Sequence, residues 1–132
     1  MKIIVKKENI IKDKYYLWNR FIECLINEEF GNDLSQIQHV AKSCFWYDTE
    51  MNNGGHSGYF DVYADKNYEQ VKKSLILIGA EQYAKNLSIA IETGINDDYI
   101  STDDRFRELI PELTDIIEKY VVDNISEFFI IE

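Results

Sequence analysis

Apolar side chains recur along most of this chain at intervals of three and four residues, the spacing of one face of an α-helix. The glycines fall between these periodic stretches rather than inside them, and only one proline is present. Residue types that commonly cap helices precede several of the stretches. The pattern predicts helices that begin near Asp13, Asp33 or Ser35, Ser57, Asn67, Ala80, Ser101 and Pro111.

The two ends of the chain are apolar but too short to assign. Residues 1–5 read MKIIV and residues 128–132 read FFIIE, which suits either short strands or frayed ends. Gly31 and Gly94 are expected to end two of the helices. With 132 residues, 45% of them hydrophobic, the chain has material for one core. We therefore expect an all-α protein of six or seven helices, a single domain over residues 1–132 whose termini are either short strands or frayed ends.

The charge balance narrows the choice of partner. The formal net charge is −10, which disfavours direct binding to nucleic acid or to an anionic membrane, because both require a positive surface. A basic protein is the more natural partner. The charge is also uneven: residues 1–20 carry six Lys or Arg against Glu8 and Asp13, so this segment is basic in an otherwise acidic chain.

The two cysteines, Cys24 and Cys44, form no CxxC pair and lie within helical apolar patterns. We interpret them as buried, reduced side chains. The chain start lacks the apolar core of a signal peptide, and no stretch approaches the roughly 20 apolar residues of a membrane span. These features predict a cytoplasmic protein.

The stretch NNGGHSGYF, residues 52–60, is the strongest candidate for a functional loop. It follows a predicted helix rather than a strand and contains no Lys, which excludes a P-loop and a dinucleotide-binding turn. Asn and Gly favour the backbone conformations that end helices. We therefore interpret the stretch as a joint between two helices, with Ser57 capping the second and His56 solvated in a loop. His39, the other histidine, is expected on the exposed side of its helix.

Metal and catalytic sites find little support. Two His and two Cys at scattered positions give no zinc pattern. Residues 97–108 have the span of an EF-hand loop, but Thr102 stands where that loop needs glycine. The sequence therefore predicts no metal site, no cofactor and no catalytic residues.

The last predicted helix carries a more suggestive pattern. Glu112, Asp115 and Glu118 lie roughly opposite the apolar residues Leu113 and Ile117. Carboxylates three or four residues apart on a helix are about 5–6 Å apart at Cβ, close to the spacing of phosphates along a nucleic-acid strand. Such a row is either an ordinary solvated face or a surface that presents phosphate-like charge to a DNA-binding protein.

Two joints carry a family resemblance, best over residues 43–92. They are marked by Asn53, Gly54, Gly55, Tyr59 and Phe60 at the first and by Gly79 and Ala80 at the second. In their order and spacing the chain resembles a family of small acidic bacterial proteins, long catalogued as a domain of unknown function, that includes a DNA mimic. The family usually has an aromatic residue after the two glycines and Gln two places later; here His56 and Gly58 stand there.

The resemblance implies an all-helical homodimer and, for the mimic type, binding to a transcription factor in place of its operator. Our preferred hypothesis is therefore a non-enzymatic acidic binding protein of this kind. The alternative is an immunity-type or regulatory inhibitor of a basic toxin or enzyme, which would use the same electrostatic attraction. A weaker alternative is a small ligand-binding or hydrolytic protein with a pocket near His56, Tyr59 and Tyr63.

Overall fold

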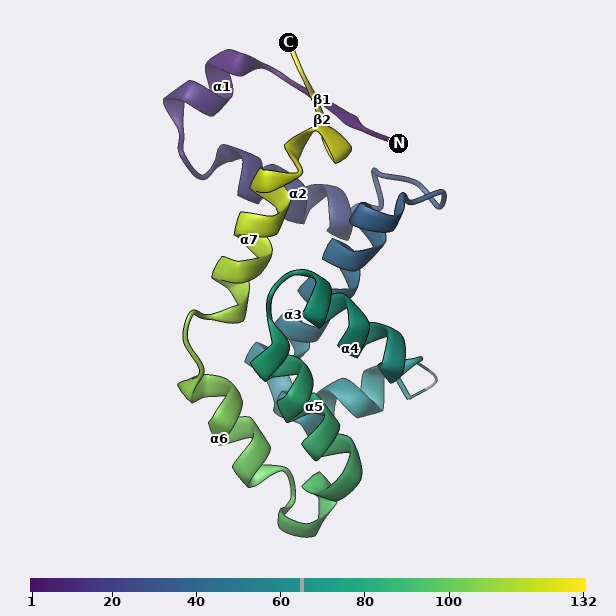
Figure 1. The fold of residues 1–132 in the computed structure, drawn as a ribbon. Helices are drawn as coiled ribbons and strands as arrows, with labels where there is room; N and C mark the ends of the chain where they lie inside the picture. Colours follow the sequence, from purple (N-terminus) through teal and green to yellow (C-terminus); the bar gives the residue numbers. More distant parts are fainter. Residues whose placement is uncertain (65) are drawn as a thin grey trace.

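The computed structural model describes residues 1–64 and 66–132, and these are predominantly helical (Figure 1). The elements in chain order are β1 (Ile3–Val5), α1 (Lys7–Lys12), α2 (Tyr16–Ile26), α3 (Gln36–Val62), α4 (Tyr68–Leu77), α5 (Glu81–Thr93), the 3-10 segment η1 (Gly94–Asp97), α6 (Ile100–Glu108), α7 (Leu113–Asp123), the 3-10 segment η2 (Ile125–Glu127) and β2 (Phe129–Ile131). The predicted all-α class, with seven helices and extended structure at the termini, is confirmed.

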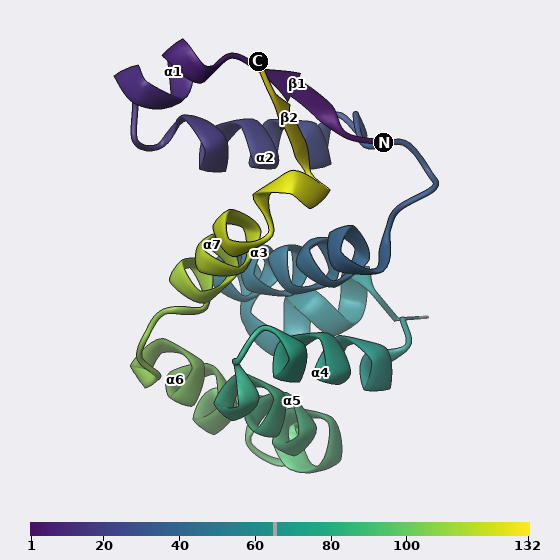
Figure 2. The same ribbon diagram turned by 45° about the horizontal axis from the view of Figure 1, so that its top comes forward.

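The long helix α3 organises the rest of the molecule. It contacts α4 on one side, and it contacts both α6 and α7 elsewhere along its length. Figure 1 shows β1, α1, α2 and β2 gathered at one end of the molecule and α4, α5 and α6 at the other. In Figure 2 α7 lies beside α3 between these two groups. No helix in the described part of the chain is long and apolar enough to cross a membrane.

The two ends of the chain pair with each other as short parallel strands. Ile3, Ile4 and Val5 are in register with Phe129, Ile130 and Ile131. Val5 and Phe129 turn into the core, whereas Ile4 and Ile130 are exposed. The ambiguous apolar ends are therefore strands, and each provides the only partner that the other has among the described residues.

A side-chain amide ties this strand pair to the start of α3. Ser35 caps α3 by accepting the backbone N–H of Gln38, and the Gln38 side chain accepts the backbone N–H of Ser35 in return. The Nε2 of Gln38 also donates to the carbonyl oxygens of Met1 (3.0 Å) and Glu127 (2.8 Å). One buried side chain thus satisfies a helix cap and both chain ends.

Several predicted helix boundaries are wrong. The segment after β1 forms the unforeseen helix α1. Asp13 is the C-cap residue of α1 rather than the N-cap of α2, which is Tyr15, and the Asp13 Oδ1 accepts the Tyr15 N–H. Helix α2 ends at Ile26, well before Gly31. Ser101 was predicted to cap α6, but it lies inside the first turn of that helix. Its backbone N–H donates to the carboxylate of Asp97, which precedes the helix.

The core near the termini is built from aromatic rings around Phe21. Trp18, Phe45 and Phe128 each place a ring centroid between 5.3 and 6.3 Å from a neighbour in this group. Cys24 and Cys44 are both free and fully buried, as predicted. Burial raises the pKa of the Cys24 thiol to about 12, which keeps it protonated.

We expect Gln38→Met to destabilise the protein by about 2 kcal/mol, because the partly buried Met1 and Glu127 carbonyls lose their donor and the Ser35 N–H loses its acceptor. Chemical denaturation measures the change. The matched control is Gln36→Met, at an exposed position in the first turn of the same helix, which should change stability by less than about 0.5 kcal/mol. Equal midpoints for the two variants would contradict the role assigned to Gln38.

Candidate partner-binding surface and the polar contacts beneath it

The stretch of residues 52–60 is a joint inside α3. Gly55 has φ 66° and ψ −165°, a conformation almost restricted to glycine, and it separates two helical segments that otherwise run from Gln36 to Val62. The interpretation of the stretch as a joint is therefore correct. Its second cap was assigned wrongly, because Ser57 lies inside the second segment and the helix resumes directly at His56.

The cap of the second segment comes from a distant helix. Asp103, in α6, accepts the backbone N–H of His56 through Oδ1 at 3.0 Å. A Cβ added to Gly55 would collide with the same carboxylate. Glycine is thus required at this position for two independent reasons: its positive φ and the close approach of Asp103.

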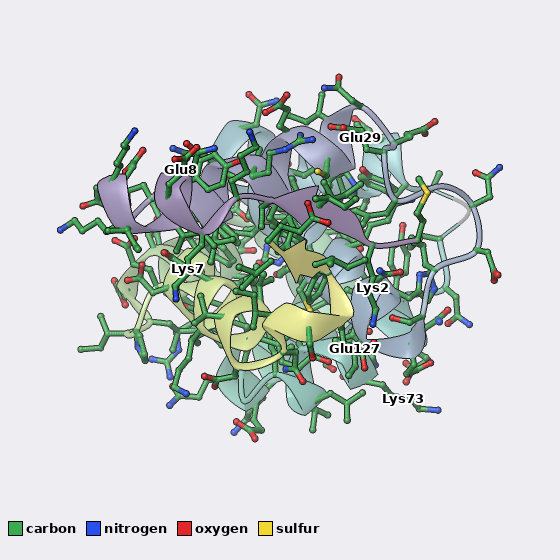
Figure 3. The ribbon with its side chains drawn as sticks, turned by 90° about the horizontal axis from the view of Figure 1, so that it is seen from above. Lys2, Lys7, Glu8, Glu29, Lys73 and Glu127 are labelled. Atoms are coloured by element: carbon green, nitrogen blue, oxygen red, sulfur yellow. The ribbon has the colours of Figure 1, made fainter. Side chains whose placement is uncertain are left out.

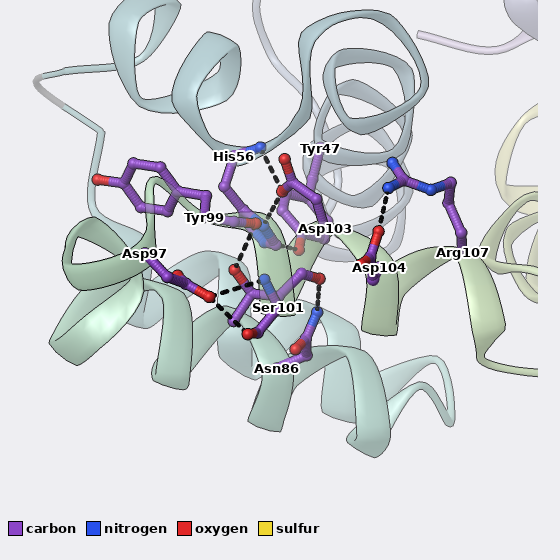
Figure 4. Close-up of polar contacts among 10 residues, drawn as sticks. Tyr47, His56, Asn86, Asp97, Tyr99, Ser101, Asp103, Asp104 and Arg107 are labelled. Atoms are coloured by element: carbon purple, nitrogen blue, oxygen red, sulfur yellow. Dashed lines mark hydrogen bonds and ion pairs between the residues drawn. The ribbon is translucent and has the colours of Figure 1, made fainter.

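The prediction that His56 is solvated is wrong, since its side chain is fully buried. Its Nδ1 lies 2.8 Å from the Asp103 Oδ1, and its Nε2 lies 2.8 Å from the Tyr47 hydroxyl (Figure 4). Because a carboxylate accepts and a hydroxyl can donate, these partners fit a neutral ring that carries its proton on Nδ1. Burial lowers the pKa of His56, and the Asp103 carboxylate opposes that shift in part.

A histidine held by a carboxylate is also the arrangement of many general bases. Catalysis needs a free nitrogen in reach of a substrate, and here the Nε2 of His56 already accepts from Tyr47. Burial keeps the pKa of Tyr47 well above its usual value near 10. His56, Tyr47 and Asp103 line none of the five main cavities of the described residues. The arrangement therefore holds α3 and α6 together rather than exposing a reactive group.

Two further buried contacts fix the connection from α6 to α7. The Tyr83 hydroxyl, on α5, lies 3.1 Å from the Leu109 carbonyl oxygen and 2.7 Å from that of Pro111. The Thr114 hydroxyl, at the start of α7, donates to the carboxylate of Asp48. Burial raises the pKa of Asp48, while its hydrogen bonds from Thr114 and Asn52 oppose the rise. The first turn of α7 is consequently anchored to α3, and the connection before it is anchored to α5.

The predicted acidic row lies on this anchored helix. Glu112 is the N-cap residue of α7, and Asp115 follows in the first turn; both are exposed, whereas Glu118 is half-buried. Leu113 and Ile117 point into the core, as their spacing indicates. None of the three acids forms an ion pair with any described residue. Whether this row binds a partner stays a prediction.

The negative charge of this row also affects the pKa of a buried group. Glu112 and Asp115 both contribute to raising the pKa of the buried Asp48. Ion pairs stand on either side of the row: Arg107 with Asp104 on α6, and Lys119 with Asp123 at the end of α7. Two unpaired carboxylates, Glu112 and Asp115, thus lie at the N-terminus of α7, where the helix dipole favours negative charge.

The residues that mark the family resemblance lie at the joint inside α3 and at the turn between α4 and α5. Tyr59 is buried, and the Phe60 ring stacks 5.9 Å from that of His56. Gly79, with φ 87°, ends α4, and Ala80 is the buried N-cap of α5. Asn53 and Gly54 are exposed at the end of the first α3 segment.

Residues 32–129 match the family of DMP19-like proteins. The chain belongs to the DMP19-like family. This membership confirms the resemblance drawn from the two joints to a family that includes a DNA mimic. No curated protein and no solved structure gives a significant match. The matched part runs from just before α3 into β2, so it contains the joint at Gly55 and the acidic row but not β1, α1 or α2.

We expect Gly55→Ala to cost at least about 2 kcal/mol of folding free energy, because of the positive φ and the collision with Asp103. Gly54→Ala is the matched control: it is helical, its Cβ would meet no atom within 4 Å, and the change should be neutral or stabilising by up to about 1 kcal/mol. Urea denaturation of both variants checks the contrast. Similar losses at the two positions would rule out a special role for Gly55.

The lowered pKa of His56 predicts a dependence of stability on pH. The folded state binds a proton at His56 less readily than the unfolded chain, so this contribution is complete above pH 6.5 and is lost as the pH falls below it. An NMR titration should show His56 protonating below pH 6.5. Between pH 7.5 and 5.5, His39→Gln should lose stability as the parent protein does, and His56→Asn should lose less. A His56 ring that titrates above pH 6.5 would contradict the prediction.

Proposed function

We propose that this protein is a non-enzymatic DNA mimic whose acidic row, Glu112, Asp115 and Glu118, occupies the DNA-binding surface of a basic protein such as a transcription factor. The observation that carries the proposal is the row itself: carboxylates without ion pairs on an anchored helix, in a member of the DMP19-like family. A net charge of −10 supports a basic partner.

The mechanism is electrostatic replacement of phosphates. Successive carboxylates on α7 offer the Lys and Arg of a DNA-binding groove negative charge at about the spacing, 5–6 Å, that a nucleic-acid strand provides. Attraction of this kind speeds association and is screened by salt, because the Debye length is about 10 Å at 0.1 M. The complex should therefore form rapidly and dissociate as ionic strength rises.

Rigidity of the surface favours this mechanism. The Thr114–Asp48 bond fixes the first turn of α7, and Tyr83 fixes the turn before it. A charged surface that is already ordered loses little conformational entropy when it binds. The polar contacts beneath α7 would thus contribute to affinity without touching the partner.

The basic N-terminal segment does not interfere with this surface. Figure 3 looks down on the end of the molecule where Lys2 and Lys7 lie, beside the paired termini. Figure 1 shows that the C-terminal end of α7 faces those termini while its N-terminal end, which carries Glu112 and Asp115, faces α6. The basic N-terminal segment therefore lies at the end of the molecule that holds the paired termini, whereas the first turn of α7 lies on the side of that helix away from the termini, toward α6.

Affinity capture from the native host's lysate tests the proposal. A DNA-binding protein that elutes with salt and is displaced by its operator DNA would support mimicry, whereas a nuclease or toxin would favour the immunity-type alternative. Light scattering of the free protein tests the homodimer that the family resemblance implies. Capture of no basic protein would count against both binding hypotheses.

With the partner in hand, we expect Glu112→Gln/Asp115→Asn/Glu118→Gln to weaken binding on the order of tenfold or more at low salt and to flatten its salt dependence. The matched control, Asp61→Asn/Glu81→Gln/Glu92→Gln, removes the same charge from exposed positions on α3 and α5 and should weaken binding far less. Calorimetric titration at several salt concentrations measures both. Equal effects of the two triple variants would place the binding surface elsewhere.

A further inference from the structure

A cavity of about 340 Å³ lies on the other side of α3 from α7. Its walls come from the end of α2, from α3 and from the loop that follows α3. Four lining residues from the first segment of α3 are spaced as one helical stripe: His39, Lys42, Ser43 and Trp46. Tyr59 comes from the second segment, after the break at Gly55. Asp48, which reaches Thr114 of α7, lies about 200° around the helix from Trp46. The cavity and the acidic row therefore face different directions.

Two hydroxyl groups that line this cavity form no hydrogen bond with any described residue. They belong to Ser43 and Tyr59, which are 6% and 2% exposed as residues. No fully enclosed side-chain N or O atom among the described residues lacks a partner, so the oxygen atoms of these two hydroxyls are not fully enclosed. Since both residues line the cavity, their hydroxyls are available there to a polar ligand.

The remaining lining residues indicate which ligand chemistry suits the cavity. Trp46 and Tyr63 are half-buried and present aromatic surface to the cavity. Lys42 and Lys66 line the cavity without an ion pair to any described residue, and Glu28 is the one acid among the described lining residues. The described lining thus carries two lysines against one acid, in a chain of net charge −10. It favours an anion over a cation.

We propose that this cavity binds a small molecule with a flat aromatic ring and one anionic group, either a carboxylate or a phosphate. The ring packs against Trp46 and Tyr63, the anionic group meets Lys42 and Lys66, and the hydroxyls of Ser43 and Tyr59 hydrogen-bond polar atoms of the ligand. The volume lies within the range of small-molecule sites, about 300–1,000 Å³, which combine apolar walls with a few polar groups in the same way.

Calorimetric titration with four probes tests the proposal: 2-naphthoate, adenosine 5′-monophosphate and their uncharged counterparts 2-naphthamide and adenosine. At least one anion should bind with a dissociation constant below about 1 mM, and its uncharged counterpart should bind at least about tenfold more weakly. Preference for the carboxylate or the phosphate identifies which group the site takes. Absence of binding for both anions, or equal binding of the charged and uncharged probes, would overturn the proposal.

Variants separate recognition by the lysines from a general effect of charge. Lys42→Ala/Lys66→Ala should weaken binding of the anion at least about tenfold. Lys7→Ala/Lys12→Ala removes the same charge from exposed positions on α1 and should leave binding unchanged. Equal losses for the two double variants would overturn the assignment of Lys42 and Lys66.

The hydroxyls provide a readout that a purely structural role would not give. Ser43→Ala and Tyr59→Phe should weaken ligand binding several-fold while leaving the thermal midpoint of the free protein nearly unchanged, because neither hydroxyl bonds to another described residue. Tyr47→Phe, which deprives His56 of its hydrogen bond, should lower that midpoint. A comparable loss of midpoint in all three variants would show that the cavity hydroxyls serve folding instead.

Discussion

The carboxylate of Asp103 is the contact on which the geometry of this protein depends. It caps a helical segment that begins after a break at Gly55, and it holds the buried ring of His56. Both partners belong to one short joint in α3, whereas Asp103 lies 47 residues further along in α6. The direction of the second α3 segment and the position of α6 are therefore set together. A group that satisfies a helix end and a buried ring at once cannot be moved without exposing both.

Other polar side chains of α3 also join this helix to distant segments of the chain. Gln38 joins the chain ends to its first turn, Asp48 receives α7 in its middle, and His56 receives α6 after the break. Each contact joins α3 to a segment distant in sequence. Apolar packing is non-directional, so these few hydrogen bonds select one arrangement among many that would bury similar area. The hydrogen bond between Asp48 and Thr114 is the one that holds the acidic row of α7 in place.

The helix caps and helix faces that depend on local sequence were predicted correctly. The wrong predictions concern positions where a contact with a distant segment decides the structure. The caps Ser35 and Asn67 satisfy backbone N–H groups three residues away, so spacing alone revealed them. The outward direction of the acidic row followed from the burial of Leu113 and Ile117 in the same way. The prediction of Ser57 as a cap was wrong because the Asp103 carboxylate, from α6, caps the second segment of α3 instead. No local sequence pattern indicates a partner so distant along the chain.

Other features had weak signals or none. Helix α1 buries no residue, so it leaves no apolar periodicity to detect. His56 stands where the family usually carries an aromatic residue, and its ring does pack beside Phe60 and Tyr99. That substitution was the one available sign that the ring is buried. The hydroxyls of Ser43 and Tyr59 gave no sign, because a missing partner is visible only in three dimensions.

The pairing of β1 with β2 also bears on the order in which the fold forms. Ile3 pairs with Phe129, so nearly the whole described chain separates the two strands. Closing so long a loop costs chain entropy, and contacts of large sequence separation tend to form late in folding. Until β2 reaches β1, the Nε2 of Gln38 has no Glu127 carbonyl to bind, and Phe21 lacks the ring of Phe128. We therefore expect the end of the molecule that holds the two strands to close after the helices around α3 have assembled.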